Sequence, residues 1–89
     1  MPRVVFTDNL QRHVNCPPCE VNGPTVRAAL DAYFSQFPGV RGYILDEHGA
    51  VRPHIIIFAD GLPLRDRGTL SDAVGPSDEV YVMQALSGG

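Results

Sequence analysis

Apolar side chains recur at intervals of three and four between residues 26 and 37, and this spacing predicts an amphipathic helix. Thr25 comes directly before the segment and is a good N-cap residue, while Pro38-Gly39 follows it as a helix-ending pair. The apolar positions are Val26, Ala29, Leu30, Tyr33, Phe34 and Phe37. They share one side of the helix, which therefore has a single face to bury.

Short apolar runs bounded by turn residues predict strands before and after this helix. The predicted strands are residues 3–6, a segment ending at Val21, residues 54–59, residues 62–64 and residues 79–85. Residues 43–51 predict a small hairpin with Gly49 at its turn, and residues 69–72 predict one helical turn. One long helix beside several strands indicates an α+β fold, with the helix packed on one face of a mixed sheet.

Because side chains alternate along a strand, the last strand should divide its residues between the two faces of the sheet. Our assignment places Val80, Val82, Ile56 and Phe58 under the helix. Tyr81, Met83 and Ile57 are then expected on the open face. An apolar patch on an uncovered face indicates a surface for a partner protein.

The 89 residues predict one domain, residues 1–85, followed by a flexible tail, residues 86–89. The net charge of −3 argues against nucleic acid or an anionic membrane surface as a partner. The longest apolar run, residues 55–59, is too short to span a bilayer. The first residues lack the core of a signal peptide, so the expected location is cytoplasmic.

The sequence ends in Gly88-Gly89, which a folded domain has little reason to carry, since glycine offers no side chain to bury. Without Cβ atoms, these residues can enter a narrow channel and present the carboxylate of Gly89 to ATP in another protein. We expect the tail to be mobile from about Leu86 onward.

All seven Lys and Arg residues are arginine. A GC-rich coding sequence is the simpler explanation, and the functional one is a lack of amines that could capture an activated carboxylate.

Two segments, residues 54–72 and 78–89, resemble the second half of ubiquitin-like β-grasp proteins. They are most similar to the prokaryotic sulfur carriers of the MoaD/ThiS family. The hallmark is a strand that opens with Asp-Glu-Val, here at 78–80, and reaches Gly-Gly about eight residues later. The start of the helix and Asp60-Gly61 also fit. Two features depart from the family. Residues 84–87 lack the prolines usual in molybdopterin-synthase subunits, and residues 43–52 are longer than in the smallest thiamine carriers.

The resemblance implies a carrier rather than an enzyme, with no tightly bound cofactor. An E1-like adenylyltransferase would use ATP to adenylate Gly89, and a sulfurtransferase would supply the sulfur donor that makes the thiocarboxylate. A sulfur-accepting enzyme would then take the sulfur for molybdopterin, thiazole, cysteine or another product. Gly88 would supply slenderness and Leu86 an anchor at the channel mouth. The neighbouring genes would identify the pathway.

Two other functions stay open on the sequence. The chain could be a protein modifier joined through Gly89 to lysines of other proteins. It could also be a small redox or metal-binding module that uses Cys16 and Cys19, with His13 as a third candidate ligand. Structural zinc sites normally have four protein ligands, so we assign no metal site. The prolines of Cys16-Pro-Pro-Cys19 favour an extended backbone that holds the two cysteines too far apart for a disulfide.

Overall fold

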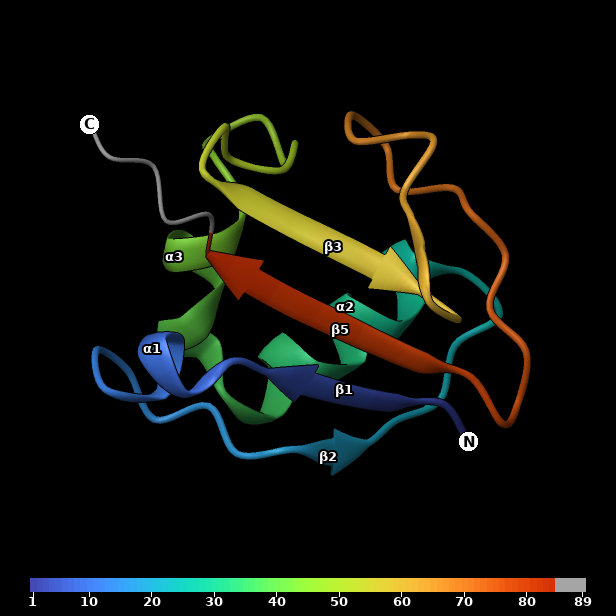
Figure 1. Cartoon of the computed structure of the whole chain (residues 1–89), viewed down its shortest axis with the longest axis horizontal. Coiled ribbons are helices and arrows are strands. Elements are labelled where there is room, and N and C mark those ends of the chain that lie inside the picture. Colours follow the sequence, from blue (N-terminus) through green and yellow to red (C-terminus); the bar gives the residue numbers. More distant parts are fainter. Residues whose placement is uncertain (85–89) are drawn as a thin grey trace.

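The computed structural model describes residues 1–84, and the whole chain is drawn in Figure 1. Five strands form one sheet in the order β2-β1-β5-β3-β4. The strands are β1 (Arg3–Phe6), β2 (Cys19–Glu20), β3 (Ile55–Ala59), β4 (Leu62–Pro63) and β5 (Glu79–Gln84). The helical segments are α1 (Asp8–Gln11), α2 (Val26–Gln36), the 3-10 turn η1 (Pro38–Val40) and α3 (Arg41–Ile44).

The last strand, β5, is the central strand of the sheet. It pairs in parallel with β1 and antiparallel with β3. In Figure 1 α2 crosses behind these three strands, and no helix crosses in front of β5 and β3. The expected α+β arrangement, one main helix on one face of a mixed sheet, is therefore confirmed. Because β1 and β5 are parallel, both strands start at one end of the sheet and finish at the other.

The start of α2 is fixed by a cap and by a close backbone contact. The hydroxyl of Thr25 accepts a hydrogen bond of 3.1 Å from the amide of Ala28, as its N-cap position predicts. Gly23 lies so close to the helix that a Cβ atom there would be 2.5 Å from the backbone nitrogen of Ala29. The apolar stripe of α2 packs into the core, and Val26, Ala29, Leu30 and Tyr33 have no exposed surface.

Three local predictions are corrected by the structure. Tyr43 belongs to α3 and not to a strand, so the predicted hairpin is reduced to a single bridge between Leu45 and Val51. Gly49 does lie in the connecting turn with a φ of +82°. Residues 69–72 form no helix, and the buried Leu70 there has a φ of +55°. The short helix α1 lies in the stretch that the sequence predicted to be a polar connection.

The face assignment was right for β5 and wrong for β3. Val80 and Val82 are fully buried under α2, as expected. Ile57, which we had placed on the open face, is only 1% exposed, because it pairs with Val82 and shares its side of the sheet. Antiparallel partners point to the same face, so Ile56 and Phe58 are the residues on the open side. A one-residue error in parity exchanges the whole set.

The helices of residues 1–84 can be compared with the length and hydropathy that a membrane span requires. No helix there has both the length and the apolar character needed to cross a bilayer.

Candidate functional site

The chain leaves the sheet at the end of β5, and the groups around Gln84 define this exit. The side chain of Gln84 accepts a hydrogen bond of 3.1 Å from the side-chain amide of Asn9 in α1. The amide of Thr7 donates to the carbonyl of Val82 at 3.1 Å, which continues the pairing of β1 with β5. The predicted functional residues Leu86, Gly88 and Gly89 lie beyond this point, outside the described residues. The predicted mobility of the tail lies outside them as well.

A continuous apolar patch covers the open face of the three central strands. We call it the open-face patch, and it comprises Val5, Ile56, Phe58, Tyr81 and Met83. All five side chains are partly exposed. Tyr81 is paired with Phe58 on one side and Val5 on the other, and Met83 is paired with Ile56. Since Met83 directly precedes Gln84, the patch extends to the strand end from which the tail leaves.

Charged residues bound the open-face patch at its other end. There Arg3 is aligned with Glu79 of β5 and with Glu20 of β2. The patch therefore ends at charged residues near the start of β5, and its apolar side chains continue to the residue before Gln84.

Sequence analysis found Tyr81 and Met83 of this patch and missed Val5, Ile56 and Phe58. Their role in docking stays a prediction. Val5 could have been found, since it alternates with the buried Val4 and Phe6 in β1. For β3 the sequence held no such signal, because every residue of the strand is apolar.

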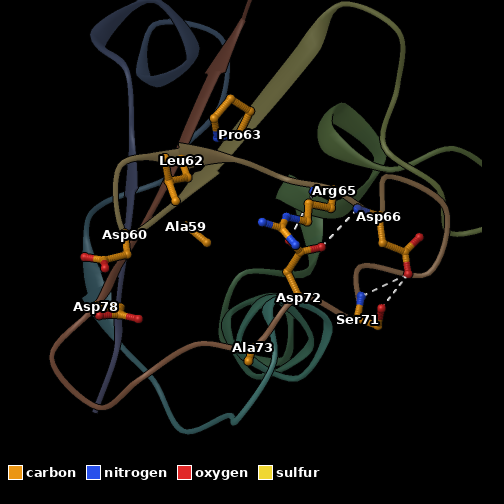
Figure 2. A pocket seen from close by; sticks show the side chains of 10 residues that line it. All are labelled: Ala59, Asp60, Leu62, Pro63, Arg65, Asp66, Ser71, Asp72, Ala73 and Asp78. Atoms are coloured by element: carbon orange, nitrogen blue, oxygen red, sulfur yellow. Dashed lines mark hydrogen bonds between the residues drawn. The ribbon is translucent and has the colours of Figure 1, made fainter.

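A hollow of about 490 Å³ lies at the end of the sheet away from Gln84, and Figure 2 shows its lining. Four aspartates face it, Asp60, Asp66, Asp72 and Asp78. Three of these carboxylates are already used within their own loops. Asp72 accepts from the amides of residues 65 and 66, and Asp78 accepts from the amide of Gly75 at 2.7 Å.

The third of these carboxylates, Asp66, stabilises the turn formed by residues 66–71. It accepts hydrogen bonds from the hydroxyls of Ser71 and Thr69 and from backbone amides of the same turn. These bonds hold the pKa of Asp66 well below its usual range, with the Ser71 hydroxyl the largest cause. The acidic lining therefore shapes the loop that leads into β5.

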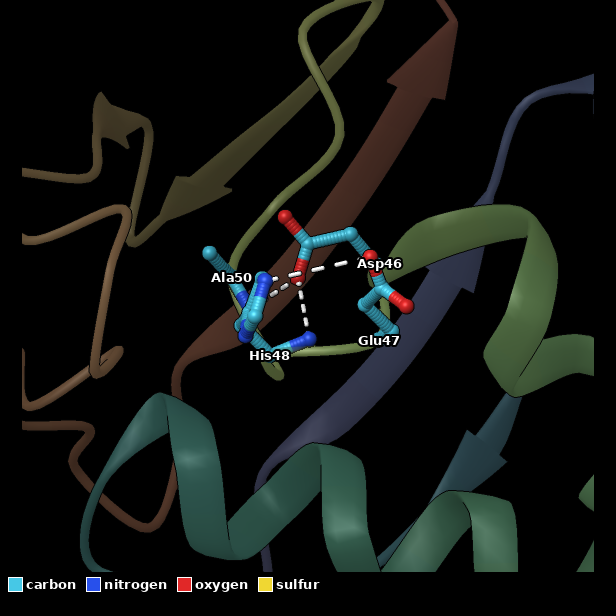
Figure 3. Close-up of polar contacts among 4 residues, drawn as sticks. All are labelled: Asp46, Glu47, His48 and Ala50. Carbon is cyan, nitrogen blue, oxygen red and sulfur yellow. Dashed lines mark hydrogen bonds and ion pairs between the residues drawn. The ribbon is translucent and has the colours of Figure 1, made fainter.

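The acidic segment after α3 serves a similar structural purpose, as Figure 3 shows. Asp46 accepts hydrogen bonds from the amides of His48 at 2.8 Å and Ala50 at 3.0 Å. The Ala50 amide is the main reason why the pKa of Asp46 is lowered. Glu47 and His48 form an exposed ion pair of 3.8 Å, of a kind that contributes little to stability.

The cysteines are free and differently placed. Cys16 is buried, which raises the pKa of its thiol, while Cys19 is partly exposed on the edge strand β2. Between them, the carbonyl of Pro17 accepts a hydrogen bond of 2.7 Å from the buried hydroxyl of Tyr33. Within residues 1–84 no three His, Cys, Asp or Glu side chains come together as a metal site, so His13 does not join the two cysteines. A buried thiol with a raised pKa is unsuited to nucleophilic or redox chemistry.

No family model and no curated protein sequence matches this chain. Solved structures do match it. A chain of the BexX/CysO complex from Amycolatopsis orientalis has a TM-score of 0.83 and 22% identity, with 100% of both chains covered. Small archaeal modifier protein 1 from Methanosarcina acetivorans has a TM-score of 0.79 and 21% identity, over 99% of this chain and 95% of that one. Urm1 from Sulfolobus solfataricus has a TM-score of 0.68 and 19% identity, over 93% and 99%.

The chain has the ubiquitin-like β-grasp fold. The fold that the sequence resemblance implied is thus confirmed by the sheet order, by the position of α2 and by these neighbours. In this fold the central strand of the sheet, β5, is also the last strand in the sequence. The residues after Gln84 therefore continue from a strand that is paired on both of its edges.

Proposed function

We propose that this β-grasp domain is a sulfur carrier whose Gly89 is adenylated and then converted to a thiocarboxylate. The observation that supports it best is the position of β5. The central strand ends beside the apolar Met83 and Ile56 and leads into a segment that closes with two glycines. The proposal requires that Gly89 is the last residue of the protein in the cell and carries its free carboxylate. Intact mass of the protein isolated from its own cells tests that part directly.

In the proposed reaction, an E1-like enzyme binds the carrier and ATP. A carboxylate oxygen of Gly89 attacks the α-phosphate, pyrophosphate leaves, and an acyl-adenylate forms. A persulfide on a sulfurtransferase then attacks the acyl carbon, AMP leaves, and an acyl disulfide joins the two proteins. A second thiol, from the sulfurtransferase or from free cysteine, attacks the sulfurtransferase sulfur of this bond; a new disulfide forms and the thiocarboxylate is released. The thiocarboxylate delivers its sulfur to an acceptor held by a third enzyme. All bond-making groups other than Gly89 belong to the partners, so ATP and the sulfur donor are substrates of the partners.

The carrier's own contribution is docking and reach. The open-face patch gives the partner an apolar surface that begins one residue before Gln84. From there residues 85–89 span at most about 18 Å when fully extended. That length allows the sheet to rest outside a partner while the end of the chain enters its active site. Leu86 is proposed to anchor the channel mouth and Gly88 to keep the last turn of the path narrow.

The test combines the purified chain with the E1-like enzyme encoded nearest to its gene, ATP, and a sulfurtransferase with cysteine. Intact mass should increase by the exchange of one oxygen for one sulfur. A variant that lacks Gly88 and Gly89 is the matched control and should show no change. If every candidate activator leaves the mass unchanged and catalyses no carrier-dependent pyrophosphate exchange, the carrier function is wrong.

A protein modifier is the second candidate, and the similarity to small archaeal modifier protein 1 favours it. Both functions begin with the same activation of Gly89, and they differ in what attacks the acyl carbon. Lysine-linked adducts of the chain, found by mass spectrometry in cells that express it with an affinity tag, would identify the modifier. Adducts that persist when Gly89 is deleted would contradict it.

A further inference from the structure

Four of the seven arginines surround the end of the sheet from which the tail leaves. They are Arg12, Arg41, Arg52 and Arg67, and we call them the exit arginines. Arg12 follows α1, the helix whose Asn9 binds Gln84. Arg41 is the first residue of α3, and Figure 1 shows α1 and α3 near the tip of the β5 arrowhead.

Hydrogen bonds connect the other two exit arginines to the same end. Ile55 is the strand partner of Gln84. The guanidinium of Arg67 donates to the carbonyl of Ile55 at 2.7 Å and to that of Arg52 at 2.8 Å. Arg52 in turn donates through Nε to the carbonyl of Gly42 in α3 at 2.8 Å. Arg67 thus donates to two carbonyl groups through one guanidinium nitrogen and Arg52 donates to one through Nε, so the fold uses both side chains.

The fold gives no such reason at Arg12 and Arg41. Both side chains are exposed, and within residues 1–84 neither makes a side-chain hydrogen bond or an ion pair. Lysine would carry the same charge at these two positions and has nearly the same helix propensity. The chemical difference between the two residues is nucleophilicity. A guanidinium stays protonated at every relevant pH, whereas a lysine amine loses its proton in a small fraction of molecules near neutral pH and then attacks acyl groups.

We propose that arginine at the exit makes this end of the domain inert toward the activated carboxylate that it carries, an inference that rests on the proposed function. The reaction avoided is aminolysis. A neutral amine would attack the carbonyl carbon of Gly89, a C–N bond would form and the bond to AMP would break. AMP would leave, the released proton would pass to solvent, and the carrier would be lost as a dead-end amide. The exit arginines thus determine which nucleophile the acyl group meets.

Geometry makes self-capture a real competitor. Five residues span at most about 18 Å when fully extended. α1 contacts Gln84 directly, and α3 is linked to Ile55, the strand partner of Gln84, through the hydrogen bonds of Arg52 and Arg67. We therefore expect an amine at position 12 or 41 to lie within reach of Gly89. A flexible attachment of this length would give an effective concentration on the order of millimolar. The α-amine before β1 is held away, because the parallel pairing of β1 with β5 places it at the opposite end of the sheet.

The experiment uses the full chain with Gly89 converted chemically to a thioester of mercaptoethanesulfonate, which needs no activating enzyme. Arg12→Lys and Arg41→Lys place an amine at the exit. Arg65→Lys is the matched control, since Arg65 is also exposed but lines the hollow at the start of β5. Each protein is incubated at mildly alkaline pH, and its products are followed by intact mass. A self-amide has the mass of the acid less one water, and fragmentation locates the bond.

We expect the wild-type thioester to be lost by hydrolysis to the acid. Arg12→Lys and Arg41→Lys should form at least about tenfold more internal amide than Arg65→Lys, because their amines share the short attachment to Gln84. Two results would overturn the inference. Exit variants that hydrolyse like the wild type would show that an amine there is not acylated. Equal amide formation by Arg65→Lys, or by the wild-type α-amine, would show that an amine at the exit is acylated by Gly89 no more readily than an amine elsewhere. Neither result depends on whether an E1-like enzyme accepts the chain.

Discussion

Replacing Ile57 by alanine should destabilise the domain far more than replacing its neighbour Ile56, although the two residues are chemically identical. Ile57 is 1% exposed and lies under α2, whereas Ile56 is partly exposed on the open face. Removing a buried isoleucine side chain costs about 2–5 kcal/mol, made up of lost burial and the cavity that remains. The same change at Ile56 should cost about 1 kcal/mol or less, since no cavity forms at a surface position.

The size of the effect makes the comparison decisive. A domain of 89 residues is expected to have a total stability of about 4–13 kcal/mol, so the Ile57 variant loses a large share of it. In urea, with an m-value of about 1–2 kcal/mol/M for a chain of this size, the midpoint should fall by on the order of 2 M. Ile57→Val provides a milder step of about 0.5–1.5 kcal/mol and guards against a variant that simply fails to fold.

The assay is equilibrium urea unfolding followed by circular dichroism, with both variants and the wild type measured in parallel. Equal losses for Ile56→Ala and Ile57→Ala would refute the register in which Ile57 faces Val82. A larger loss at Ile56 would restore the assignment that the sequence had predicted. Binding to an activating enzyme gives the complementary measurement, because Ile56→Ala should weaken docking while Ile57→Val should leave it unchanged.

Three further predictions concern the loops and the open face. Gly23→Ala should cost about 1–3 kcal/mol, since its new Cβ would overlap the backbone of Ala29, while Gly39→Ala, with nothing within 4 Å, should cost little in the same urea titration. Asp66→Asn should destabilise the domain most above about pH 5. The native pKa of Asp66 lies below its unfolded value, so its contribution is present at neutral pH and is lost as pH falls; a variant-to-wild-type difference that grows toward pH 2 would contradict this. Met83→Asp should weaken binding of the activating enzyme about tenfold or more and leave the unfolding midpoint nearly unchanged, and an unchanged affinity in titration calorimetry would remove Met83 from the docking surface.

The elements that sequence patterns could predict are those whose own residues determine their state. The 3.6-residue period of α2 and the N-cap at Thr25 belong to the segment itself, and both were found. The alternation of β5 places two valines inward because Glu79, on the other face of the strand, favours the surface. Gly49 was found as a turn residue for a similarly local reason, since its positive φ suits glycine.

The errors arose where tertiary contacts decide between local alternatives. Residues Ile55–Ala59 are apolar at every position, so only pairing with β5 determines which side faces α2. Tyr43 and Ile44 fit a strand and a helix equally well as a short apolar run. In the structure η1 leads directly into α3, and the helical state follows from that continuity. The loop that Asp66 organises depends on the hydroxyl groups of Thr69 and Ser71, three and five residues away.

The same reasoning explains why the candidate site is divided between what the sequence shows and what only the fold reveals. The chemistry proposed for Gly89 needs no neighbouring side chain of its own domain, so two glycines at the end of the sequence were enough to indicate it. The groups that would protect and present that carboxylate come from distant segments: α1 and β3 meet at Gln84 because β5 occupies the centre of the sheet, and α3 is linked to them through Arg52 and Arg67. The proposed carrier would therefore keep its reactive group apart from the groups that control its selectivity. On this basis, substitutions around the exit should change which nucleophile captures the acyl group, whereas substitutions in the open-face patch should change how often it is activated.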